Sequence, residues 1–202
     1  MKRKKTHSPQ QDRIAKAQKR LQEFHLPHGP FDYATQTQAL AEARALLGSI
    51  VSACRTYHRD PAAELVIEAA RRLYSAALDA AYPPGFWDDY ERLRAGDASG
   101  LESAVSFLEA DPIFRRTGYV KEKLIRYIKP HMLTPETASR LQNVVLSLVD
   151  RRDDRDFRAF CRLARKVDGP DLRAHLTQRL THNDPNVQRR ARWVLEAICQ
   201  NN

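Results

Sequence analysis

The stretch Asp184–Leu195, with the sequence DPNVQRRARWVL, decides the fold because it reads as the opening of an amphipathic helix. Asp184 is a good N-cap, and Pro185 suits the first helical position because the N–H that it lacks would have no intrahelical partner there. Apolar residues then recur at three- and four-residue steps: Val187, Ala191, Val194 and Ile198. A helix this short is not stable alone in water, so its apolar face must pack on neighbouring helices.

Two similar helices precede this one. We predict that Asp153 begins the first and that Gly169-Pro170-Asp171 begins the second. Their apolar faces consist of Phe157, Phe160, Ala164 and Val167 in the first helix, and of Leu172, Leu176 and Leu180 in the second. Three short amphipathic helices in succession are typical of a helical array, in which neighbours bury one another's apolar faces.

Residues 184–195 resemble the opening helix of a HEAT repeat. In that family an Asp-Pro turn is followed by Val, then Arg, then Ala, then Leu, and this segment has the same order. Thr134-Pro135 and Gly169-Pro170 resemble the same start more weakly. The resemblance implies an α-solenoid in the C-terminal half of the chain and no specific activity, because one fold can carry many functions.

The sequence of the first half of the chain also predicts helices. We predict helices over residues 9–24, 35–57 and 61–80, the last two joined by a turn short enough for an antiparallel hairpin. Their predicted inward residues are Ile14, Ala17, Leu21 and Phe24; Leu40, Ala43, Leu47, Ile50, Cys54 and Tyr57; and Leu65, Ala69, Leu73, Ala76 and Ala80. Glycine is scarce and proline stands at many helix starts, so the sequence predicts an all-α chain of stacked antiparallel helix pairs.

Charge divides the chain into three predicted regions. Residues 1–30, a basic tail and N-terminal helix, contain 8 Lys/Arg and 2 Asp/Glu. Residues 31–112 form an acidic helical region with 7 Lys/Arg and 13 Asp/Glu, and residues 113–202 form the basic HEAT-like repeat region with 19 and 10. This segregation favours an anionic partner for the basic C-terminal half.

The first candidate site is a basic stripe on the side opposite the apolar face of the helix predicted from Asp153. Two arginines of the last helix extend it, so that the candidates are Arg151, Arg155, Arg158, Arg162, Arg165, Lys166, Arg189 and Arg192. The planar guanidinium donates paired hydrogen bonds to phosphate or carboxylate groups. The alternative interpretation is a solvated face whose arginines pair with Asp153, Asp154 and Asp156.

The second candidate is the segment 114–123, where aromatic residues stand beside arginines and lysines. Arg115 and Arg116 could contact phosphates while Phe114 and Tyr119 stack on bases. The alternative interpretation, which the sequence favours, makes Phe114 and Tyr119 core anchors at a helix junction.

The sequence contains no catalytic motif, metal-ligand spacing or phosphate-binding loop, so we predict no catalytic residue, metal or cofactor. Cys54, Cys161 and Cys199 match no zinc spacing and indicate reduced thiols in the cytoplasm. No apolar run approaches the length of a membrane span.

The function predicted from these features is that of a non-enzymatic interaction protein. It would bind a macromolecular partner, protein or nucleic acid with an anionic surface, through the basic C-terminal half. The first alternative is a protein whose partner is specifically a nucleic acid. The second is a DNA glycosylase, because some alkylpurine DNA glycosylases consist of HEAT-like repeats and use an Asp with a Trp in a basic cleft. No such pair can be matched residue by residue in this sequence.

Overall fold

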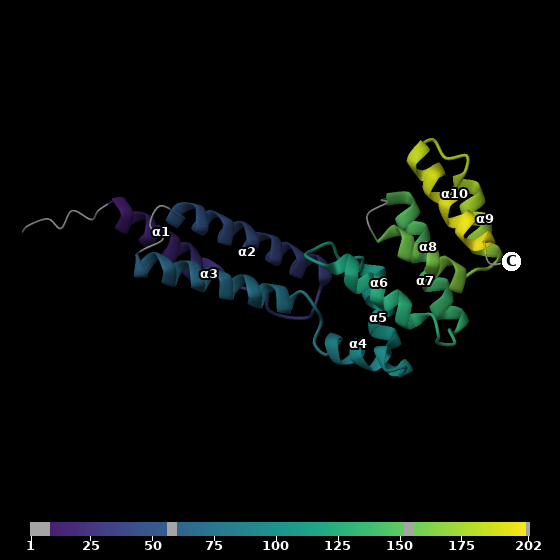
Figure 1. Cartoon of the computed structure of the whole chain (residues 1–202), viewed down its shortest axis with the longest axis horizontal. Coiled ribbons are helices and arrows are strands. Elements are labelled where there is room, and N and C mark those ends of the chain that lie inside the picture. Colours follow the sequence, from purple (N-terminus) through teal and green to yellow (C-terminus); the bar gives the residue numbers. More distant parts are fainter. Residues whose placement is uncertain (1–8, 56–59, 152–155, 201–202) are drawn as a thin grey trace, which may run out of the picture. The chain divides into compact units, whose positions relative to one another are not determined.

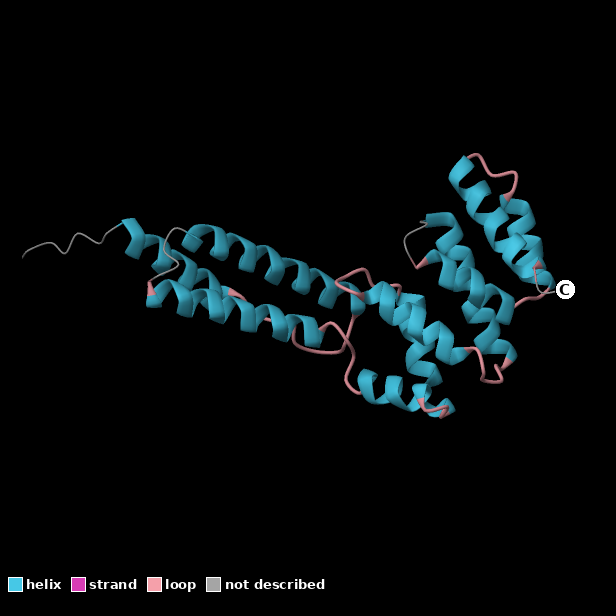
Figure 2. Cartoon of the chain, viewed as in Figure 1, coloured by secondary structure: helices cyan, strands magenta, loops and turns pink. Residues whose placement is uncertain are grey.

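The computed structural model describes residues 9–55, 60–151 and 156–200. Within these ranges the regular elements are helices and no strand occurs (Figure 2). The prediction of an all-α chain is therefore confirmed. The predicted helix start at Asp153 lies outside the described residues.

The chain divides into two compact units, residues 1–84 and 85–202. This division follows packing and not charge, so it differs from the sequence-based boundaries after residues 30 and 112. The predicted separate N-terminal helix belongs to unit 1, and the end of the acidic region belongs to unit 2. Charge describes the solvent-facing side of each helix, whereas a unit is defined by its apolar contacts.

Unit 1 consists of three helices, α1 (Pro9–Glu23), α2 (Tyr33–Cys54) and α3 (Pro61–Ala80). Helices α2 and α3 run side by side in opposite directions, as the hairpin prediction requires, and α1 packs on both (Figure 1). The side chain of Asp32 accepts a hydrogen bond from the backbone N of Thr35 at 2.7 Å, and that of Asp60 accepts one from Ala62 at 2.9 Å. These carboxylates satisfy N–H groups that the first turn of a helix leaves unpaired.

Small residues form much of the interface between the helices of unit 1. The predicted inward face of α1 is confirmed, since Ile14 and Ala17 are buried and Leu21 and Phe24 pack against the core. The predicted face of α3 is right only in part: Leu73 packs against the core, whereas Leu65 is 67% exposed and Ala76 is exposed. The buried face of α3 lies one position along, at Ala63, Val66, Ile67, Ala70 and Ala77. Apolar residues surround so much of α3 that two stripes fit the period, and only packing distinguishes them.

Unit 2 contains seven α-helices and one 3₁₀ turn among the described residues. They are α4 (Phe86–Arg94), η2 (Ala98–Gly100), α5 (Leu101–Ala110), α6 (Thr117–Ile128), α7 (Pro135–Arg151), α8 (Phe157–Lys166), α9 (Pro170–Arg179) and α10 (Pro185–Cys199). Proline occupies the first position of α7, α9 and α10, as predicted. Helix α8 contacts α6, α7 and α10, and α9 contacts α7 and α10.

The inward faces predicted for the last three helices are largely confirmed. The buried residues include Phe157, Phe160, Ala164, Val167, Leu172, Leu176, Val187, Ala191, Val194 and Ile198, whereas Leu180 is half-buried. The side chain of Asp184 accepts a hydrogen bond from the backbone N of Asn186 at 2.8 Å, which caps α10. The HEAT-like arrangement of these helices stays a prediction.

Polar side chains join the helix ends of unit 2. Arg190 is buried, and its Nε donates to the carbonyl of Val149 at the end of α7 at 2.6 Å. Gln142 Nε2 donates to the carbonyl of Val167 at the end of α8 at 2.7 Å. These bonds satisfy carbonyl groups that a helix leaves unpaired at its C-terminus. They also fix the positions of α7, α8 and α10 relative to one another.

Candidate functional site

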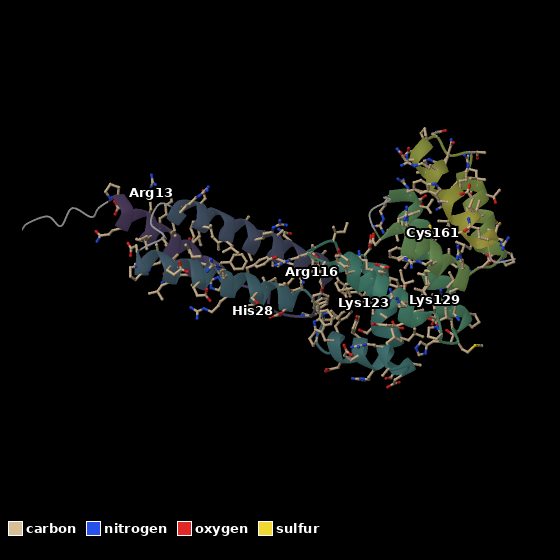
Figure 3. The ribbon with its side chains drawn as sticks, in the orientation of Figure 1. Arg13, His28, Arg116, Lys123, Lys129 and Cys161 are labelled. Atoms are coloured by element: carbon tan, nitrogen blue, oxygen red, sulfur yellow. The ribbon has the colours of Figure 1, made fainter. Side chains whose placement is uncertain are left out.

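A groove with a volume of about 970 Å³ lies in unit 2. Its lining comes from the start of α6, from the first two turns of α8 and from Trp193 of α10. The residues involved are Arg116, Gly118, Tyr119, Glu122, Asp156, Phe157, Arg158, Ala159, Cys161, Arg162 and Trp193. Arg116 and Cys161 are labelled on the side-chain view (Figure 3). Segments far apart in the sequence therefore meet at this groove.

The backbone before α6 places Arg116 at the groove. Arg116 has a φ of 67°, in the left-handed region that residues other than glycine adopt rarely. The hydroxyl of Thr117 donates to the carbonyl of Phe114 at 2.8 Å and accepts from the Phe114 N–H at 3.3 Å. These bonds hold the turn from which α6 begins. The backbone position from which the Arg116 side chain projects is therefore fixed.

Two aromatic side chains in the groove are exposed. Tyr119 is 48% exposed and Trp193 is 42% exposed. The interpretation of Tyr119 as a core anchor is therefore wrong. Trp193 makes an edge contact with the buried Phe157, with ring centroids 6.1 Å apart. This contact supports one side of the indole and orients it.

Four arginines gather at the groove. Arg116, Arg158 and Arg162 line it, and the guanidinium carbon of Arg189 lies over the Trp193 ring, 5.1 Å from its centroid. Arg162 Nη2 lies 3.3 Å from Glu122 Oε1, an exposed pair that contributes little to stability. Arg158 forms no ion pair with any residue that the structure describes. The groove thus presents guanidinium groups beside exposed aromatic rings.

A buried ion cluster lies behind the groove. Lys121 is 1% exposed, and its Nζ lies 2.6 Å from Asp111 Oδ1 and 4.0 Å from Asp156 Oδ2. Asp111 adopts a φ of 43° at the end of α5, and Asp156 directly precedes α8. The ammonium group therefore joins three helix ends and compensates the carboxylate of Asp156 that lines the groove. Lys121 itself is not available to a partner, although it belongs to the basic segment 114–123.

The other candidate residues that the structure describes do not line the groove. Arg165 Nε donates to the carbonyl of Ala197, so this side chain joins α8 to α10. Arg151 donates to the side-chain and backbone oxygens of Ser147, and its Nη2 lies 3.9 Å from Asp111 Oδ2. Lys166 is half-buried, Arg115 and Arg192 are exposed, and Arg155 lies outside the described residues. The candidate basic residues therefore differ in role: some make contacts within unit 2, and others stay at the surface.

Sequence reasoning did not name Trp193 or Cys161 as site residues, and it placed Glu122 within the second candidate segment without giving it a role. Arg189 and Trp193 stand four residues apart, a spacing that places them on the same face of a helix, so this pair could have been recognised. Burial raises the pKa of the Cys161 thiol to about 11, even though Arg165 and Arg162 favour the thiolate. Cys161 is therefore a weak nucleophile at neutral pH.

Metal-binding clusters and membrane-spanning helices are two further features that bear on function. Within the described ranges, no group of three or more His, Cys, Asp or Glu side chains is arranged to hold a metal ion. No described helix has the length and apolar character needed to cross a membrane. Comparisons with protein-family models, with curated proteins and with solved structures give no match to this chain.

Proposed function

We propose that this protein is a non-enzymatic helical-repeat interaction protein that binds an anionic macromolecular partner through the groove of unit 2. The observation that supports the proposal is the gathering of Arg116, Arg158, Arg162 and Arg189 around the exposed Tyr119 and Trp193. Arginine and aromatic residues are enriched where proteins bind one another, and arginine also suits phosphate. The chain's net charge of +9 attracts anionic partners over longer distances.

The packing of the last four helices supports the repeat part of this proposal. Helix α7 contacts α8, α9 contacts α10, and the two pairs meet through α7 with α9 and α8 with α10. In a HEAT-like array each helix pair packs on the next in this manner and leaves helix faces open to a partner. Arg158 and Arg162 project from one such face of α8.

The test reverses charge at the groove by changing Arg158→Glu together with Arg162→Glu. Binding of a mixed-sequence oligonucleotide and of polyglutamate would be measured, each as a function of salt. The matched control is Arg44→Glu with Arg72→Glu in unit 1, which makes the same change in net charge at two exposed positions. We expect the groove variant to lose binding of the polyanion that the wild type binds, and the control to retain it.

Two further measurements make this test decisive. Circular dichroism of both variants must match the wild type, because the four positions are exposed and leave the core intact. The wild type and both variants should also be compared after neutralising Lys2, Arg3, Lys4 and Lys5, whose charges alone can hold a polyanion. A groove variant that still binds like the wild type would refute the proposal.

The DNA glycosylase remains a second candidate because Asp156 and Trp193 line the same groove. The carboxylate of Asp156 lies beside Lys121 and is largely buried, which does not favour contact with a substrate sugar. An assay for release of alkylated bases from DNA, with Asp156→Asn as the comparison, tests this candidate. Release by the wild type that is abolished in the variant would replace the non-enzymatic proposal.

A further inference from the structure

We propose that the partner bound in the groove is an unpaired nucleic-acid strand, whose bases stack on Tyr119 and Trp193 while its phosphates contact Arg116, Arg158 and Arg162. This inference rests on the proposed function and specifies the partner. Its basis is the meeting of exposed aromatic rings and guanidinium groups in one groove of about 970 Å³.

Both aromatic residues of the groove keep a large part of their surface exposed. Tyr119 projects from the first turn of α6 and Trp193 from the middle of α10, so the groove has a ring on two of the helices that line it. Trp193 keeps 42% of its surface exposed although Phe157 contacts its edge and Arg189 lies over the ring. A base stacks on such rings regardless of its identity, because every base has a π-face.

The charges of the lining favour phosphate. Of its two acidic residues, Asp156 is compensated by Lys121 from behind, and Glu122 pairs with Arg162. Arg116 and Arg158 then face the groove without an ion-pair partner among the described residues. Arg189 adds a further guanidinium beside Trp193. This excess of positive charge matches a chain that carries one negative charge per nucleotide.

The combination favours an unpaired strand over a duplex. In a duplex the bases stack on one another inside the helix, so Tyr119 and Trp193 would find no free base face. Phosphate contacts with a duplex need arginine and lysine but no exposed aromatic ring. Exposed rings beside arginines are the pattern by which proteins hold single strands without reading their sequence.

The first experiment follows Trp193 directly. The chain has two tryptophans, and Trp87→Phe leaves Trp193 as the one fluorescent indole. Oligo(dT) and oligo(U) of about 12 nucleotides, within the range of known single-strand sites, would be titrated into this variant. We expect both to quench Trp193, and a hairpin duplex of equal charge to quench it less. Quenching by either oligonucleotide supports the proposal.

The second experiment removes the rings and keeps the charges. Binding of labelled oligo(dT) to Tyr119→Leu and to Trp193→Leu should weaken at least about fivefold, with the salt dependence unchanged. The control is Trp87→Leu, because Trp87 is also exposed, at 47%, but lies outside the groove lining. By contrast, Arg158→Glu with Arg162→Glu should make the salt dependence shallower, by about 0.7 in the logarithmic slope for each phosphate that the variant no longer neutralises.

The outcomes separate this inference from the proposed function. If the arginine reversal removes binding while Tyr119→Leu and Trp193→Leu bind like the wild type, anionic binding stands and the unpaired strand is refuted. Equal affinity for duplex and single strand refutes it as well, and so does tighter binding of polyglutamate than of either oligonucleotide. If the arginine reversal changes nothing, both proposals fail.

Discussion

The two units of this protein hold their helices together through different kinds of interaction. Unit 1 joins three helices through an apolar interface rich in alanine, including Ala63, Ala70 and Ala77. Unit 2 joins mostly shorter helices and adds buried polar bonds near their ends, from Lys121 and Arg190. Long helices bury enough apolar surface along their length, whereas short helices leave a larger share of unpaired backbone groups at their ends.

This difference explains where the candidate site lies. In unit 2 some basic residues are buried inside the fold, while others that are close to them in sequence stay at the surface. Arg190 is buried against the end of α7, while Arg189 lies over Trp193. Lys121 is buried, while Lys123 is exposed. The net charge of a segment therefore overstates how many of its charged side chains a partner can contact. The following variants test that conclusion.

The largest expected effect is that of Lys121→Ala in unit 2. Removal of the ammonium takes away the cation that lies 2.6 Å from the buried carboxylate of Asp111 and 4.0 Å from that of Asp156, which should cost about 3–5 kcal/mol even though Arg151 Nη2 remains 3.9 Å from Asp111. Both tryptophans, Trp87 and Trp193, belong to unit 2, so tryptophan fluorescence during urea unfolding reports this unit. Lys123→Ala is the control and should leave the midpoint unchanged. An equal midpoint for the two variants would show that the ion cluster is solvated.

The second effect distinguishes neighbouring arginines. Arg190→Ala should destabilise unit 2 by about 1–3 kcal/mol, because the carbonyl groups of Val149 and Asp150 lose their donor. Arg189→Ala should leave stability within about 0.5 kcal/mol of the wild type, since this side chain is exposed. The same fluorescence measurement applies. If Arg189→Ala proves the more destabilising change, the assignment of structural and surface roles is reversed.

The third effect tests the apolar interface of unit 1. Ala77→Leu should cost about 1–3 kcal/mol because the added side chain enters a close contact between helices. Ala76→Leu, at the preceding position, places the same side chain in solvent and should be nearly neutral. Thermal unfolding followed by circular dichroism compares them. The opposite order would favour the face predicted from sequence over the one seen in the structure.

The smallest effect concerns reactivity and leaves stability unchanged. The pKa of Cys161 is raised to about 11 by burial, so its thiolate is scarce at neutral pH and increases only as the pH rises toward that value. Iodoacetamide at about pH 8 should therefore modify the exposed Cys199 well before Cys161. Mass spectrometry of the modified peptides measures both rates. Faster labelling of Cys161 would show that the groove is more hydrated than this structure indicates.

The sequence by itself determined the helical class and many helix boundaries. Pro61, Pro135, Pro170 and Pro185 each begin a helix as predicted, because proline fixes the required φ and needs no hydrogen-bond acceptor at that position. The apolar faces of α1, α8 and α10 were also readable, since each has a single well-defined stripe. Local information suffices for features that depend on residues within one or two turns.

Only the tertiary structure decided which polar residues are buried and which meet at the groove. Lys121 reaches the carboxylates of Asp111 and Asp156, which belong to other helix ends, and Tyr119 shares the groove with Trp193 from another helix. Periodicity gives the direction of a side chain around its own helix, but it contains no information on which other helix covers that direction. The buried face of α3 and the division of the basic residues into structural and surface groups both depend on those neighbours.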